Sequence, residues 1–160
     1  MSVTLLLIQV LNGLQLGVIL FLIAAGLTLV FGVMGFINLA HGVQYMVGAY
    51  LCWAFFQLTG SFPAALVLAL PAALALGVLL EVLVFRHLYD RDHLVQVLAT
   101  FGVIIFLNQL AKVLFGPAAL SVPPPEILDW SFPLIDGLRY SAYRIALIVA
   151  GLAVALGLWL

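Results

Sequence analysis

Residues 10–33 read VLNGLQLGVILFLIAAGLTLVFGV, and this uncharged apolar run decides the class of protein. No Asp, Glu, Lys or Arg occurs before Glu81. A charge at the centre of a bilayer costs about 2.5 to 3.5 kcal/mol, whereas a surface that faces water needs charges for solubility. The first half of the chain is therefore predicted to lie in lipid.

The composition of the whole chain indicates a membrane protein. Of its 160 residues, 67% are hydrophobic and 7% are charged, and the mean hydropathy is +1.35. Ordinary soluble domains contain roughly 45–50% apolar and 25% charged residues. The net charge of −1 offers no basic surface to a phosphate backbone, so we expect no binding of nucleic acid.

Five apolar runs predict an all-α fold, a polytopic membrane bundle of about five transmembrane helices, because each crossing needs about 20 residues. Such runs are too long for barrel strands, and helices satisfy every backbone polar group within lipid. The expected spans are about 10–33, 39–58, 62–85, 94–115 and 143–160.

Residues 1–160 are expected to form a single membrane domain with aqueous loops at 86–93 and 116–140. The second loop holds five of the seven prolines, so we expect it to be extended or irregular. The last apolar run has no closing polar flank. We therefore expect the chain to be the N-terminal part of a longer protein.

A broken or re-entrant segment is predicted near residues 32–42, which read GVMGFINLAHG. Without a break here, about fifty apolar residues would be continuous, which is too many for one crossing. Gly32, Gly35 and Gly42 are the candidate residues for the break. Gly13 and Gly17, with Gly48, are candidate packing positions, because small residues let helices approach closely in lipid. We favour packing within the chain over a contact between subunits.

A polar stripe follows the break if the second helix begins at Asn38. At helical spacing it comprises Asn38, His41, Tyr45, Gly48 and Cys52, with Gln44 beside them. In a structural interpretation, Asn38 caps the helix and His41 donates a hydrogen bond to a carbonyl across an interface. In a functional interpretation, the stripe lines a path for a polar solute. The candidate residues of such a substrate pathway are Asn12, Gln15, Asn38, His41, Gln44 and Tyr45.

The loop at 86–93 reads RHLYDRDH and is expected to be solvated, with weak salt bridges. Metal binding would require four convergent ligands at fixed distances, so no metal site is predicted. Glu81, five residues before Arg86, is expected to reach or pair near the membrane boundary.

Several runs resemble the LivH-type permeases, the inner-membrane subunits of bacterial ABC importers for branched-chain amino acids. The similarity lies in NGLQLG at 12–17, AGLTLVFGVMGFINLAHG at 25–42 and YMVGAY at 45–50, and continues through 81–86 and LATFG at 98–102. The Asn-x-x-His-Gly core in a glycine-rich context is fairly specific.

The resemblance implies a multi-pass transport subunit in the bacterial inner membrane, which is not an enzyme and needs no cofactor. Its implied partners are a second permease subunit, cytoplasmic ATPase subunits and a periplasmic solute-binding protein. The chain has no Gly-x-x-x-x-Gly-Lys-Ser/Thr loop for phosphate, so ATP hydrolysis is expected on a partner. The resemblance also implies that 86–93 is cytoplasmic and 116–140 periplasmic.

Three alternatives stay open at this point. The first is a truncated membrane scaffold. The basic loop with which the family docks on its ATPase is expected beyond the fifth span, so the chain by itself is expected to be incompetent for transport. A permease for amides or urea-like solutes is the second. An intramembrane enzyme that uses His41 is the third, and it is weak because no carboxylate or serine motif accompanies this histidine.

Overall fold

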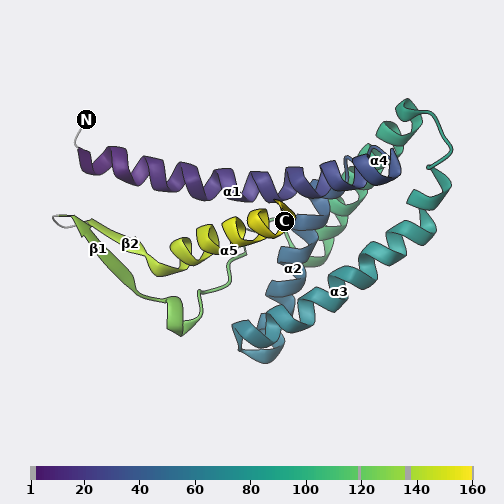
Figure 1. Ribbon diagram of the computed structural model, residues 1–160. Coiled ribbons are helices and arrows are strands. Elements are labelled where there is room, and N and C mark those ends of the chain that lie inside the picture. Colours follow the sequence, from purple (N-terminus) through teal and green to yellow (C-terminus); the bar gives the residue numbers. More distant parts are fainter. Residues whose placement is uncertain (1–2, 119, 136–137, 160) are drawn as a thin grey trace. The chain divides into compact units, whose positions relative to one another are not determined.

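The computed structural model describes residues 3–118, 120–135 and 138–159 (Figure 1). Its α-helices are α1 Val3–Met34, α2 His41–Thr59, α3 Phe62–Leu83, α4 His93–Phe115 and α5 Ala142–Trp159. The all-α class is confirmed, and the last four helices lie within about two residues of their predicted spans. The first helix begins at Val3 instead of about residue 10, because residues 3–9 contain neither glycine nor proline to end it.

In the part of the chain that the structure describes, three helical segments are long and apolar enough to cross a membrane. They are Leu5–Met34, Phe62–His87 and His93–Phe115, and the helical segment Ala142–Leu158 is apolar but shorter. The helix α2 carries polar residues at His41, Gln44 and Gln57, and these lower its mean hydropathy. A multi-pass membrane protein follows from the three long segments.

The chain divides into two compact units. The first unit comprises Met1–Ala25 and Pro124–Leu160, and the second comprises Gly26–Pro123. The helix α1 contributes to both, because Ala25 and Gly26 are consecutive residues within it.

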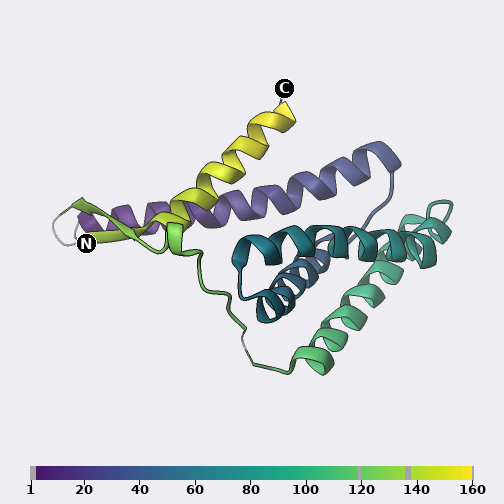
Figure 2. The ribbon, with the colours of Figure 1, turned by 90° about the horizontal axis from the view of Figure 1, so that it is seen from below.

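In the second unit, a tight turn joins α2 to α3, and the two helices pack against each other (Figure 2). Gly60 ends α2 with a φ of 65°, a left-handed conformation that glycine adopts without steric penalty. Pro63 in the first turn of α3 lacks only an amide that would have no helical partner there. The core of this unit lies beside the connection between α1 and α2, and comprises Phe36, Ala40, Val43, Leu80, Phe85, Val103 and Leu107.

In the first unit, the proline-rich loop contains regular structure before α5. A short 3₁₀ turn, η2 Glu126–Leu128, precedes an antiparallel hairpin of β1 Ser131–Ile135 and β2 Leu138–Ser141 (Figure 1). The expectation of an extended or irregular loop is thus only partly right. No strand was predicted here, because the expectation rested on the five prolines of the loop.

Candidate functional site

The predicted break between the first two helices is present at residues 35–40. The helix α1 ends at Met34, and Gly35 then adopts a φ of +63°, which residues with a Cβ rarely adopt. The Gly35 N–H still donates to Phe31 O at 2.8 Å, so the helix closes with a hydrogen bond before the chain turns away. Gly32 and Gly42 lie within α1 and α2, where they are exposed.

Two polar side chains of α4 bind the backbone of the break. The Ile37 N–H donates to Gln96 Oε1 at 3.1 Å, and the Leu39 N–H donates to Thr100 Oγ1 at 3.4 Å. Gln96 and Thr100 lie one helical turn apart and are 2% and 0% exposed. A backbone that leaves the helix among apolar side chains needs such partners, because an unpaired amide is costly there.

Gln96 also binds the turn that precedes α4. Its Nε2 donates to the carbonyl oxygens of Arg91 at 3.1 Å, Leu88 at 3.2 Å and Tyr89 at 3.4 Å. One buried carboxamide therefore contacts both the break and the turn at 88–91. Gln96 was not singled out from the sequence; the available signal was its spacing of four from Thr100 in the otherwise apolar stretch 94–107.

The aromatic ring of Phe36 joins the same two segments. It is 2% exposed, and its centroid lies 5.6 Å from that of Phe85 and 5.2 Å from that of Tyr89, the latter edge-on. The Tyr89 hydroxyl donates a hydrogen bond to the Glu81 carboxylate. Burial, together with this hydrogen bond and the charge of Glu81, raises the pKa of Tyr89 to about 12. Glu81 thus pairs near the end of α3, as expected, and its partner is Tyr89.

Asn38 is held between the two anchored amides. Its side chain is 5% exposed, and Oδ1 has no hydrogen-bond partner among the described residues. Asn38 does not cap α2, which corrects the structural interpretation: the N-cap is Ala40, without a side-chain hydrogen bond. The reason is a turn in which the His41 N–H donates to the Asn38 carbonyl at 3.3 Å, so that α2 begins only at His41. A buried acceptor without a donor costs about 1–3 kcal/mol and calls for an explanation.

The ring of His41 occupies space that Gly26 leaves open. A Cβ built at Gly26 would lie 2.9 Å from Cε1 of the imidazole, closer than side-chain atoms normally approach. Gly26 therefore lets α1 and the start of α2 come together. Sequence reasoning did not assign Gly26 this role, because nothing local distinguishes it from other glycines of the first span.

The remaining candidate pathway residues are less enclosed. In the second unit, Gln44 is half-buried and Tyr45 is 58% exposed on α2. In the first unit, Gln15 is half-buried and Asn12 Oδ1 accepts a hydrogen bond from Arg144 Nη1 at 2.7 Å. The structure thus brings Asn38 and His41 together, and the pathway as a whole stays a prediction.

The candidate packing glycines face open space within the described residues. A Cβ built at Gly13, Gly17 or Gly48 would meet no heavy atom within 4 Å. Close helix packing occurs instead at Gly151 of α5, where an added Cβ would lie 3.4 Å from Cβ of Val18 and closer still to its Cγ1. The roles of Gly13, Gly17 and Gly48 stay predictions.

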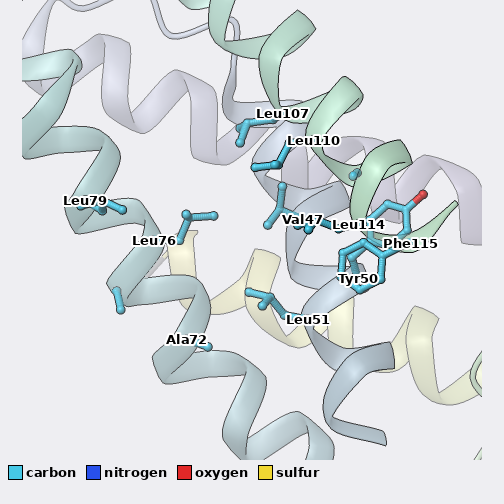
Figure 3. Close-up of a pocket in the computed structure, with 12 residues that line it drawn as sticks. Val47, Tyr50, Leu51, Ala72, Leu76, Leu79, Leu107, Leu110, Leu114 and Phe115 are labelled. Atoms are coloured by element: carbon cyan, nitrogen blue, oxygen red, sulfur yellow. The ribbon is translucent and has the colours of Figure 1, made fainter. Parts of the chain in front are cut away.

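An apolar cavity lies between α2, α3 and α4, in the second unit (Figure 3). Its volume is about 460 Å³, and its walls include Val47, Leu76, Leu107 and Phe115. The lining is almost entirely hydrocarbon, so the cavity suits an apolar group and lacks the charges that would bind a free carboxylate or ammonium. In the described part of the chain, no cluster of three or more His, Cys, Asp or Glu residues could hold a metal ion.

Residues 9–160 match the family described as the permease component of the branched-chain amino acid transport system. The chain belongs to this family. It is 30% identical to the high-affinity branched-chain amino acid transport system permease protein BraD of Pseudomonas aeruginosa, over 95% of this chain and 53% of that protein. It is 32% identical to the permease protein LivH of Escherichia coli K12, over 72% of this chain and 40% of that protein.

The chain spans about half the length of the curated relatives that it matches. No solved structure matches it. The resemblance drawn from the Asn-x-x-His-Gly core is confirmed, and the break that carries this core is also where the buried polar residues of the second unit gather.

Proposed function

We propose that this chain is part of a permease subunit of an ABC importer that moves branched-chain amino acids across the bacterial inner membrane. Family membership and three helices long enough to cross a membrane support a transport role. The observation that carries the proposal is the break at 35–40, a non-helical segment held between apolar helices by Gln96 and Thr100. Non-helical backbone at membrane depth is tolerated where it is buried in protein or lines a water-filled path.

Asn38 is our candidate for contact with the solute. Its Oδ1 is buried, has no partner among the described residues and can only accept a hydrogen bond. An α-amino acid in transit presents an ammonium group with three donors, which fits such an acceptor. His41 and Gln44 follow on α2, where they would meet the solute next.

The proposed partners are those that the family implies. A second permease subunit completes the path, ATPase subunits on the cytoplasmic side hydrolyse ATP, and a periplasmic binding protein delivers the solute. The chain itself performs no chemistry in this proposal and needs no cofactor.

Uptake by the complete system tests the cargo. Cells without high-affinity uptake of branched-chain amino acids would express the complete transporter that contains this chain and receive radiolabelled leucine. We expect saturable uptake that isoleucine and valine inhibit and urea does not. Uptake of urea or an amide, with leucine neither transported nor inhibitory, would overturn the proposal in favour of the amide alternative.

A pair of variants tests the site. Asn38→Ala is expected to reduce leucine uptake, because the solute loses its acceptor. Asn108→Ala is the matched control, since among the described residues the Asn108 side chain donates to Ile104 O of its own helix alone, at 2.9 Å. Equal uptake by the two variants, at equal amounts in the membrane, would remove Asn38 from the path.

A further inference from the structure

The carboxamide of Gln96 has two ends with different partners. Oε1 accepts from the Ile37 N–H at 3.1 Å and lies 3.3 Å from His93 Nδ1. Nε2 donates to carbonyl oxygens of the turn at 88–91, with distances of 3.1 to 3.4 Å. Because the side chain is 2% exposed, water cannot take the place of these partners if the contact with Gln96 is lost.

We infer that Gln96 is a positioning residue that couples the turn at 88–91 to the break at 35–40, so that a displacement of the turn is passed to Asn38. The inference rests on the proposed function, in which the break lies on the transport path. It assigns a role to a residue that touches no solute.

The chemistry of the side chain explains why a glutamine stands here. The break offers an N–H and needs an acceptor, whereas the turn offers carbonyls and needs a donor. A primary amide supplies both at once, while a carboxylate supplies acceptors only. An apolar residue of the same length would leave both segments without their partners.

The turn is placed to receive a displacement. Its inner carbonyls are bound by Gln96, whereas the side chains of Asp90, Arg91 and Asp92 are exposed. The ring of Tyr89 leaves the same turn and packs edge-on against Phe36 of the break, at 5.2 Å between centroids. The turn and the break thus share a hydrogen-bonded contact and an aromatic contact. A movement of the turn would therefore move the break with it.

Cysteine labelling of the complete transporter tests the coupling independently of uptake. Cys52→Ser removes the single cysteine of this chain. Ile37→Cys then reports on the break and Leu88→Cys on the turn, since both positions are half-buried and contact Gln96 only through backbone groups. Gln96→Met is expected to raise the maleimide labelling rate at both positions by about five- to thirty-fold. Gln109→Met is the matched control, because Gln109 is exposed on the same helix.

A second variant separates the two ends of the amide. Gln96→Glu keeps an acceptor for the Ile37 N–H but turns a carboxylate toward three carbonyls. Labelling at position 88 should therefore rise at neutral pH, and labelling at position 37 should rise with it. At lower pH the introduced carboxyl becomes protonated and regains a donor, and labelling should return toward the wild-type rate. If Gln96→Met does not reach the membrane, this pH series decides.

The outcomes separate the inference from the proposed function. Labelling of Gln96 variants at the rate of the Gln109 control, at every pH, would overturn the coupling whatever the cargo. Faster labelling only at position 88, with position 37 unchanged, would also overturn it. Labelling as expected in a transporter that does not take up leucine would uphold the coupling and overturn the proposed cargo.

Discussion

Gly26 of α1 faces the imidazole of His41 at the start of α2, and a Cβ at position 26 would lie 2.9 Å from Cε1 of that ring. The smallest residue on one helix thus determines where a polar ring on the next helix can lie. Because His41 is half-buried, its ring has to turn or shift if position 26 gains a side chain.

We therefore expect Gly26→Ala to reduce leucine uptake by displacing His41. The measurement is uptake at equal membrane abundance, with Gly32→Ala as control, because Gly32 lies in the same helix with open space around it. The double variant Gly26→Ala with His41→Ala should transport as His41→Ala does alone. Additive losses in the double variant would show that Gly26 acts through something other than the ring.

The second prediction concerns Thr100, which accepts the Leu39 N–H at 3.4 Å and donates to Gln96 O at 2.8 Å. Thr100→Val keeps the shape but leaves the amide of Leu39 unpaired, so we expect a loss of about 1–3 kcal/mol in the free energy of unfolding. Thr100→Ser retains the hydroxyl and should lose less. A denaturant titration in detergent measures both, and a valine variant as stable as the serine variant would contradict this role.

How far the sequence predicts this structure depends on whether a contact is local. The helices could be located because apolar runs of span length have few alternatives in lipid, and the break because Gly35 and Asn38 interrupt such a run. The partners of the break could not be found in the same way, since Gln96 lies 59 residues from Ile37. The capping role expected of Asn38 was wrong because the two turn residues Leu39 and Ala40 separate it from α2, which periodicity alone does not reveal.

The third prediction concerns the pH dependence of Tyr89. Burial and the Glu81 carboxylate raise its pKa from 10.0 to about 12, so the phenol binds its proton more tightly in the folded protein than in the unfolded chain. The resulting stabilisation is complete below pH 10 and is lost as the pH rises toward 12. The measurement is phenolate absorbance against pH. The difference between wild type and Tyr89→Phe should show one tyrosine that titrates at about pH 12.

Glu81→Gln provides the control for that titration. It removes the negative charge and keeps an acceptor for the hydroxyl, so the pKa of Tyr89 should move part of the way toward its ordinary value while burial still raises it. A Tyr89 titration at the ordinary tyrosine value in the wild type would contradict the contact with Glu81.

The fourth prediction concerns the packing of α1 against α5 in the first unit. Gly151 is buried beside Val18, where an added Cβ would overlap the valine side chain. Gly151→Ala should therefore lower thermal stability, and Val18→Ala should restore part of it by making room. Gly157→Ala serves as control on the same helix, since Gly157 faces open space. Equal melting temperatures for the two alanine variants would argue against this close approach.

The central claim is that the break carries Asn38 on the path of a branched-chain amino acid, and protection of position 38 from labelling tests it most directly. In a Cys52→Ser background of the complete transporter, Asn38→Cys would react with a small maleimide in the presence and absence of leucine and ATP, with Asn108→Cys as the control position. We predict that leucine slows labelling at position 38 and leaves position 108 unchanged. Identical labelling rates with and without leucine at position 38, in a transporter that takes up leucine, would contradict the claim.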